Sequence, residues 1–203
     1  MQHIFIKGSS ETTLILLHGT GGDEHSLVDI GRFLLPNANL LSIKGNIDEN
    51  GLTRFFKRKS FGIFDEEDLI FRTKELYDFL QSAAKQYRFD LTKAVGYGYS
   101  NGANILGNML IQIPRSITQA VLAHPMVPRR GIDLPDLSHT HVLITAGDND
   151  PIAPMSESRE LERMLKSASA DVSMYIGHKE HAISKEELEA VKTWLKKKEL
   201  IHE

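Results

Sequence analysis

No cysteine occurs among the 203 residues of the chain, so disulfide bonds, a thiolate nucleophile and cysteine-ligated zinc are excluded. Long apolar runs are missing as well: no stretch approaches the roughly 18 consecutive apolar residues of a membrane-spanning helix. The segment Met1–Gly8 lacks the basic region and the apolar stretch of a signal peptide. These absences lead us to expect a cytoplasmic protein without stable membrane insertion.

The chain also lacks a strong excess of charge of either sign. It has 24 lysines and arginines against 27 aspartates and glutamates, a formal net charge of −3. A protein that binds nucleic acid or an anionic membrane needs a basic face or a polybasic tail. The two basic runs, Lys57–Lys59 and Lys196–Lys198, are short and read as solvated surface. We therefore expect neither nucleic acid nor a membrane as a partner.

What is present is the composition of an ordinary globular domain, with 41% hydrophobic and 25% charged residues. The length suits a single domain over residues 1–203. Short apolar runs alternate with segments of helical period throughout. This alternation predicts a three-layer α/β sandwich with a mostly parallel central sheet, right-handed crossovers and no cap domain. The expected strands cover residues 3–6, 13–17, 39–43, 93–95, 119–123, 141–146 and 171–176.

The segment Gly98–Gly102 reads Gly-Tyr-Ser-Asn-Gly and lies between a short apolar run and a helical pattern. A strand, a sharp turn and a helix in this order form the context of a nucleophile elbow, which places Ser100 at the turn. The flanking glycines leave room for a strained turn, and the helix N-terminus favours negative charge that develops there. Because Gly-x-Ser-x-Gly also arises by chance, a catalytic Ser100 needs partners elsewhere in the chain.

Candidate partners follow two later strands. In an open α/β sheet, functional groups collect at the carboxyl ends of the strands. An activated serine needs a base within hydrogen-bond reach and a carboxylate that orients the base. Asp148 and Asp150 follow one expected strand, and His178 and His181 follow the last one. The order Ser, Asp, His is the one that α/β-hydrolases use, although the residues alone do not choose between the two aspartates or the two histidines.

Together these motifs resemble the phospholipase/carboxylesterase family of α/β-hydrolases, in its small bacterial form, which is related to acyl-protein thioesterases. The similarity runs along essentially the whole chain. The segments that carry it are His18–Glu24, Gly98–Asn104, His124–Pro128, Gly147–Ile152 with Pro154, and His181 ahead of the last helix.

The resemblance implies the roles of the site residues. It makes Ser100 the nucleophile, Asp150 the acid and His181 the base, and it assigns the oxyanion hole to the backbone N–H groups of Thr20 and Asn101. It also implies hydrolysis of a small-molecule ester through an acyl-enzyme, without cofactor, and a homodimer as a plausible assembly. Acyl-protein thioesterase or lysophospholipase activity, and a non-catalytic binding scaffold, are the alternatives.

The family pattern bears on the two open choices. A glycine, two variable residues and an aspartate place the acid at Asp150 rather than Asp148. The spacing to the closing helix places the base at His181 rather than His178. The chain departs from the family at Glu180, which stands where a small residue is usual. His124 is expected to be a packed or hydrogen-bonded histidine, and the remaining histidines lack the paired spacing of a metal site, so no metal is expected.

Residues 44–65 show no clean period and hold four of the nine phenylalanines. A long loop in a compact domain usually has a function. One interpretation makes it an apolar wall for the substrate; the other makes its aromatic side chains anchors of the loop to the core. The candidate substrate-binding residues are Phe55, Phe56, Phe64, Met126 and Val127. Without a cap domain, we expect an open site for short to medium acyl or aryl esters.

Overall fold

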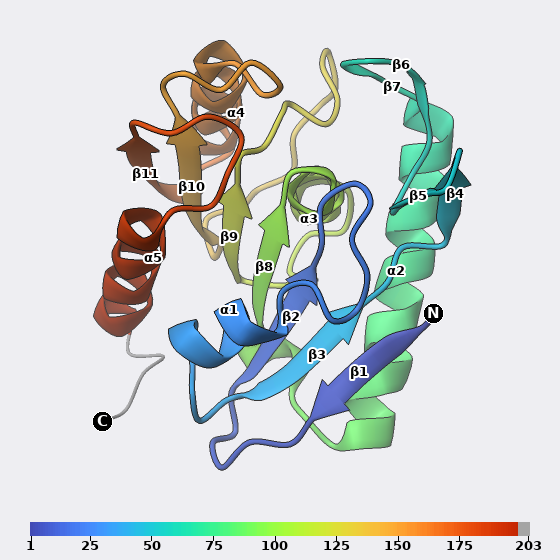
Figure 1. Ribbon diagram of the computed structural model, residues 1–203, viewed down its shortest axis with the longest axis vertical. Helices are drawn as coiled ribbons and strands as arrows, with labels where there is room; N and C mark the ends of the chain where they lie inside the picture. The colour runs from blue at the N-terminus through green and yellow to red at the C-terminus, as the bar shows by residue number, and fades with distance from the viewer. Residues whose placement is uncertain (199–203) are drawn as a thin grey trace.

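A seven-stranded sheet forms the middle layer of the computed structural model, which describes residues 1–198 (Figure 1). The strand order is β1-β3-β2-β8-β9-β10-β11. All neighbouring pairs are parallel except β1 and β3. The strands are β1 (His3–Ile6), β2 (Thr13–Leu17), β3 (Asn39–Ile43), β8 (Val95–Tyr99), β9 (Gln119–Ala123), β10 (His141–Gly147) and β11 (Asp171–Gly177).

Helices cover both faces of the sheet. On one face lie α1 (Val28–Leu34) and α5 (Lys185–Lys197); on the other lie α2 (Glu66–Tyr87), α3 (Asn101–Gln112) and α4 (Met155–Ser167) (Figure 1). A short 3-10 helix spans Leu91–Lys93. The predicted α/β sandwich with a mostly parallel sheet is thereby confirmed. Within residues 1–198, none of the helices is both long and apolar enough to cross a lipid bilayer.

The central strand β2 has apolar residues at four consecutive positions, Leu14 to Leu17, because helices cover it on both faces. All five of its residues are fully buried. Leu14 and Leu16 pack into the core beneath α1 and α5, whereas Ile15 and Leu17 pack into the core beneath α2, α3 and α4. Successive side chains of a strand point to opposite faces, so a strand covered on both sides needs apolar side chains on both faces.

The segment expected to be a loop, residues 44–65, instead forms two small hairpins. One pairs β4 (Ile47–Glu49) with β5 (Leu52–Arg54), and the other pairs β6 (Arg58–Ser60) with β7 (Ile63–Phe64). Asn50 and Gly51, at the first turn, have positive φ angles of 55° and 84°. Two such residues match the right-handed twist of a hairpin, which explains why the chain folds back here.

The parallel register places the carboxyl ends of the strands side by side. Tyr99 at the end of β8 is aligned with Ala123 at the end of β9, and Gly147 of β10 is aligned with Gly177 of β11. The loops that follow these strands therefore share one edge of the sheet. All the predicted catalytic residues lie in these loops.

At this edge the start of α3 approaches β2 very closely. A Cβ atom added at Gly102 would lie far inside the van der Waals distance of the carbonyl oxygen of Leu17. The obstacle is backbone, so it cannot move aside as a flexible side chain could. Only glycine allows α3 to begin at this position.

We expect Gly102→Ala to lower the free energy of unfolding by about 3 kcal/mol or more, because overpacking against backbone cannot relax. Gly107→Ala is the matched control in the same helix. Its new Cβ would meet Leu122 Cδ1 at 3.5 Å, an ordinary contact, and alanine favours a helix interior by up to about 1 kcal/mol. Denaturant unfolding of the two variants measures the difference; equal stabilities would contradict the packing argument.

Candidate active site

Ser100 lies in the sharp turn between β8 and α3. Its φ of 51° and ψ of −111° are unusual for a residue other than glycine, and such conformations cost of order 1–3 kcal/mol. Its backbone N–H donates to the carbonyl of Ala123 at 2.8 Å, which holds the turn against β9. The strand, strained serine and helix form the elbow that the sequence predicts, with the half-buried Ser100 at the edge of the sheet.

The structure brings Ser100, His181 and Asp150 together. Ser100 Oγ lies 2.8 Å from Nε2 of His181, and Nδ1 of His181 lies 2.7 Å from Oδ2 of Asp150. Since an ionised carboxylate only accepts hydrogen bonds, Nδ1 carries the proton and Nε2 is left to accept from the serine hydroxyl. This is the geometry of a general base oriented toward a nucleophile.

The carboxylate of Asp150 is buried and fully hydrogen-bonded. Oδ1 accepts from the backbone N–H groups of Ile152 at 2.8 Å and Ala153 at 2.9 Å. Oδ2 accepts from Nδ1 of His181 and from Nδ1 of His124, the latter at 2.8 Å. Burial by itself would raise the pKa of Asp150, but these hydrogen bonds outweigh it and leave the pKa lowered. Asp150 is therefore ionised at neutral pH.

His124 joins Asp150 to a second buried carboxylate. Its Nδ1 contacts Asp150, and its Nε2 lies 3.2 Å from Oε2 of Glu187. Ionised carboxylates at both ring nitrogens favour the doubly protonated, cationic form of the ring. Burial would lower the pKa of His124, but the hydrogen bonds and charges of Glu187 and Asp150 raise it overall. His124 is a hydrogen-bonded histidine, as expected, and its contacts favour the imidazolium.

Glu187 and Tyr99 belong to the site although the sequence did not single them out. Oε1 of Glu187 accepts from the hydroxyl of Thr145 at 2.7 Å, and the Tyr99 hydroxyl donates to the carbonyl of His181 at 2.9 Å. Burial, followed by the charges of Asp150 and Glu187, raises the pKa of Tyr99 to about 12, so it remains a donor. Ser184 and Glu187 have the sequence signature of a capping box, which they form at the start of α5. This local role accounts for Glu187 in the sequence and gives no sign of its contact with His124.

The two alternative residues form a separate pair at the surface. Nδ1 of His178 lies 2.7 Å from Oδ2 of Asp148. The side chain of His178 is 90% exposed, against 12% for that of His181. The structure thus places Asp148 and His178 together in solvent, and it places Asp150 and His181 against Ser100.

Thr20 and Asn101 flank Ser100, as the resemblance implies. Asn101 is the first residue of α3, where a backbone N–H has no acceptor within the helix. Its side-chain oxygen accepts from the N–H of Phe55 at 2.7 Å, which fixes it beside the elbow. Thr20 follows β2 and lines the same pocket as Ser100. That their backbone N–H groups form the oxyanion hole remains a prediction.

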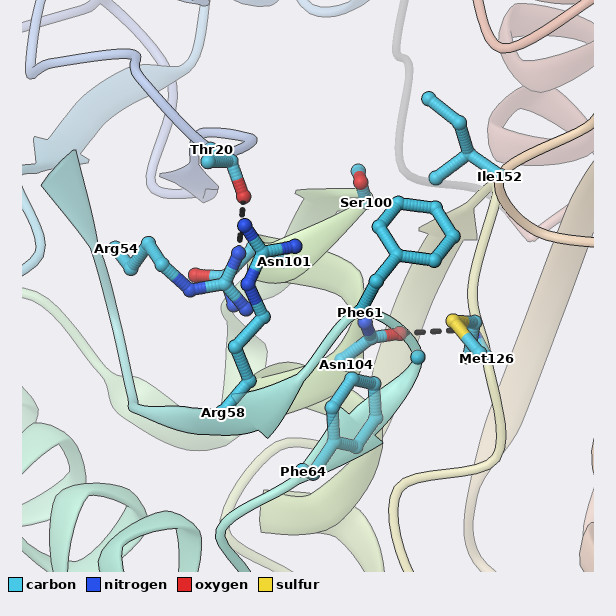
Figure 2. Close-up of a pocket in the computed structure, with 11 residues that line it drawn as sticks. Thr20, Arg54, Arg58, Phe61, Phe64, Ser100, Asn101, Asn104, Met126 and Ile152 are labelled. Carbon is cyan, nitrogen blue, oxygen red and sulfur yellow. Dashed lines mark hydrogen bonds between the residues drawn. The ribbon is translucent and has the colours of Figure 1, made fainter. Parts of the chain in front are cut away.

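A small pocket that is partly open to solvent lies beside Ser100 (Figure 2). Its apolar side is made by Phe61, Gly62, Phe64, Met126 and Ile152, and its polar side by Thr20, Arg54, Arg58, Ser100, Asn101 and Asn104. Both sides reach Ser100, so a substrate in this pocket meets apolar contacts and hydrogen-bond donors together.

Of the five residues predicted to bind substrate, Phe64 and Met126 line this pocket. Phe55, Phe56 and Val127 do not, since they are core residues with exposed fractions of 1%, 0% and 2%. Phe55 packs on the ring of His18, with centroids 4.7 Å apart, and Phe56 packs edge-on against Phe64 at 5.1 Å. They anchor the segment that carries the hairpins, which was the other interpretation of its aromatic content.

One group within the described residues has the spacing of a metal site. Ligand atoms of His124, Asp150 and His181 all lie within 4.8 Å of one another. The same atoms make the hydrogen bonds that connect Asp150 to both histidines, so an ion there would break the link to Ser100. That no metal takes part stays a prediction.

Comparison with known proteins gives close relatives over nearly the full chain, although no family model matches it. "Putative hydrolase MhqD" of Bacillus subtilis (strain 168) is 46% identical over 196 residues, which cover 97% of this chain and 98% of that protein. The crystal structure of a Bacillus cereus carboxylesterase is 48% identical, with a TM-score of 0.95, and covers 97% of this chain and 94% of the other. A Mesorhizobium loti carboxylesterase is 30% identical with a TM-score of 0.89, over 93% and 90%.

The charge of His124 is open to a direct test. At pH 7 we expect ring-nitrogen NMR to show both nitrogens of His124 protonated, and Glu187→Gln to remove one of these protons, because it removes one carboxylate. A raised pKa means that this charge stabilises the fold below about pH 6.5, and that the stability is lost as the pH rises through the raised value. The free energy of unfolding should therefore decline less steeply with pH in Glu187→Gln. A neutral His124 in the wild type would contradict the assignment.

Proposed function

The chain belongs to the phospholipase/carboxylesterase family of α/β-hydrolases and is a carboxylic ester hydrolase, and from this premise we propose that Ser100, His181 and Asp150 are its catalytic triad. The observation that carries the proposal is the continuous hydrogen-bonded path from Ser100 Oγ through both nitrogens of His181 to Asp150, with distances of 2.8 and 2.7 Å. The Ser-Asp-His order along the chain is also that of the fold.

In the first half of the reaction, Ser100 Oγ attacks the ester carbonyl carbon while Nε2 of His181 takes the hydroxyl proton. The carbonyl oxygen becomes an oxyanion, which the backbone N–H groups of Thr20 and Asn101 stabilise together with the positive end of α3. His181 then gives its proton to the departing alcohol oxygen as the carbon–oxygen bond breaks. The product is an acyl-enzyme on Ser100.

In the second half, His181 takes a proton from water, whose oxygen attacks the acyl carbonyl carbon; His181 then returns the proton to Ser100 Oγ as the bond between the acyl carbon and Oγ breaks and the acid leaves. Each half passes through an imidazolium at His181, and Asp150 stabilises that cation through Nδ1–H. The lowered pKa of Asp150 keeps it ionised throughout, so the proton stays on the histidine. The triad therefore performs both steps with groups already in place.

For the substrate, we propose small-molecule esters with short to medium acyl or aryl groups. The support is the small pocket beside Ser100, whose apolar side includes Phe61, Phe64 and Met126, and the lack of a cap domain over it within residues 1–198. Thioester hydrolysis would use the same groups; the carboxylesterase relative at 48% identity favours oxygen esters. A cytoplasmic location and a homodimer are proposals that follow from the sequence and the family.

Ser100→Ala tests the nucleophile. We expect hydrolysis of 4-nitrophenyl butyrate to fall by a factor on the order of 10⁶, because no other group can form the acyl-enzyme. Labelling by a fluorophosphonate probe should disappear at the same time, and circular dichroism should show the fold retained. A variant that still turned over the ester, or still took up the probe, would rule out Ser100.

The two aspartate and histidine pairs give a matched test of the base and acid. We expect His181→Ala to lower kcat/KM by about 10⁴-fold or more, since Ser100 loses its proton acceptor. His178→Ala removes a histidine three positions earlier, which lies in solvent beside Asp148, and should leave kcat/KM near the wild-type value. Asp150→Asn and Asp148→Asn should divide in the same way. A large loss in His178→Ala with His181→Ala active would reverse the assignment.

A further inference from the structure

The charged residues that line the active-site pocket are both arginines. Arg54 and Arg58 lie on its polar side beside Ser100, and within the described residues no carboxylate lines it (Figure 2). The whole chain carries a net negative charge of −3, so this local positive charge is not a general property of the surface. The two arginines therefore need an explanation in terms of the pocket itself.

Arg54 is buried, with an exposed fraction of 4%, and its hydrogen bonds go to neutral acceptors. Nη1 donates to the hydroxyl of Thr20 at 2.7 Å, and Nε donates to the carbonyl of Phe56 at 3.2 Å. The nearest carboxylate oxygen, on Glu49, is 3.9 Å from Nε. Burial and then the neighbouring charge of Arg58 lower the pKa of Arg54. The 3.9 Å contact to Glu49 balances this buried cation only in part, and an incompletely balanced buried charge is costly to hold.

Glu49 carries one negative charge and cannot balance both arginines, and Arg58 is the closer of the two to its oxygens. Nε of Arg58 donates to Oε1 at 3.0 Å, and Nη2 lies 2.8 Å from Oε2. Two guanidinium groups therefore share one carboxylate, and the site keeps one excess positive charge. The side chain of Arg58 is 27% exposed, so part of it faces the pocket and solvent.

A further donor on the same wall has no acceptor. Nδ2 of Asn101 is buried and without a hydrogen-bond partner among residues 1–198. Asn101 is 2% exposed and lines the pocket, while its side-chain oxygen is held by the N–H of Phe55. Guanidinium and amide donors beside one another, with excess positive charge, form a surface that matches a carboxylate.

We propose that the enzyme prefers esters that carry a free carboxylate, and that Arg58 with Arg54 binds this group while the reacting ester carbonyl lies at Ser100. The apolar side of the pocket, with Phe61 and Met126, receives the carbon chain between or beside the two groups. The substrate class is the monoester of a dicarboxylic acid. The inference rests on the proposed function, because it concerns the ester that Ser100 attacks.

The test compares two esters of equal acyl length: mono-4-nitrophenyl glutarate, which ends in a carboxylate, and 4-nitrophenyl pentanoate, which ends in a methyl group. We expect the wild type to show a kcat/KM about tenfold or more higher for the glutarate, carried mainly by KM. Added salt should reduce this ratio, because it screens the partly exposed Arg58. The succinate and adipate monoesters extend the series to other spacings.

Arg58→Gln should lower the ratio of the two kcat/KM values about tenfold, as loss of a charged hydrogen bond predicts. Arg58→Lys keeps the positive charge but loses the paired guanidinium donors that can bind both oxygens of a carboxylate, and it should give an intermediate ratio. Arg130→Gln is the control, since Arg130 pairs with Glu157 and Glu160 outside the pocket, and it should keep the wild-type ratio. Arg54 is not varied because it also holds Thr20. If Arg58→Gln fails to fold, Arg58→Lys and the salt dependence carry the test.

A wild-type ratio of one or below for all three monoesters would overturn the proposal, as would an equal effect of Arg58→Gln on both esters. If the pentanoate ester is hydrolysed through Ser100 in that case, only the carboxylate preference fails. If Ser100→Ala hydrolyses both esters as well as the wild type does, the proposed function itself fails.

Discussion

The carboxylate of Asp150 is the group on which the geometry of the site depends. It accepts four hydrogen bonds, two from the backbone of its own turn and two from histidines. The backbone donors fix the oxygens after β10, and the histidines come from the ends of β9 and β11. One buried anion thus holds three strand ends together, and its replacement would leave the buried ring of His124 with a single carboxylate partner.

Glu187 extends this dependence to the last helix. It forms the capping box of α5 with Ser184, and the same carboxylate binds His124 and Thr145. A local interaction that begins a helix is therefore also a long-range interaction that holds the active site. Because both uses share two oxygens, the position of α5 on the sheet and the position of the acid behind His181 are coupled.

Much of the fold could be predicted from the sequence because its signals are local. The apolar run of β2 predicts a strand that is buried on both faces, and the glycines around Ser100 predict a sharp, closely packed turn. The Asn50-Gly51 pair also has the local form of a hairpin turn, a signal that the expectation of a loop over residues 44–65 left unused. The contact between His124 and Glu187 leaves no such trace, since 63 residues separate them. Asp148 and Asp150, and likewise His178 and His181, are too close in sequence for spacing alone to choose between them. The family resemblance favours Asp150 and His181. In the folded turns these two lie at Ser100, whereas Asp148 and His178 pair at the surface.

The two hairpins of residues 44–65 lie outside the seven-stranded sheet, yet they supply Arg54, Arg58, Phe61 and Phe64 to the pocket. The proposed triad stands entirely on loops of the sheet. The first hairpin is tied to the site, because Arg54 binds Thr20 and the N–H of Phe55 binds Asn101. The second hairpin, residues 58–64, supplies pocket residues without such a bond, in the described part of the chain, to the proposed triad or oxyanion hole. For evolution and for engineering alike, residues 58–64 are therefore the segment whose exchange between relatives can change the substrate range while the reaction centre stays in place.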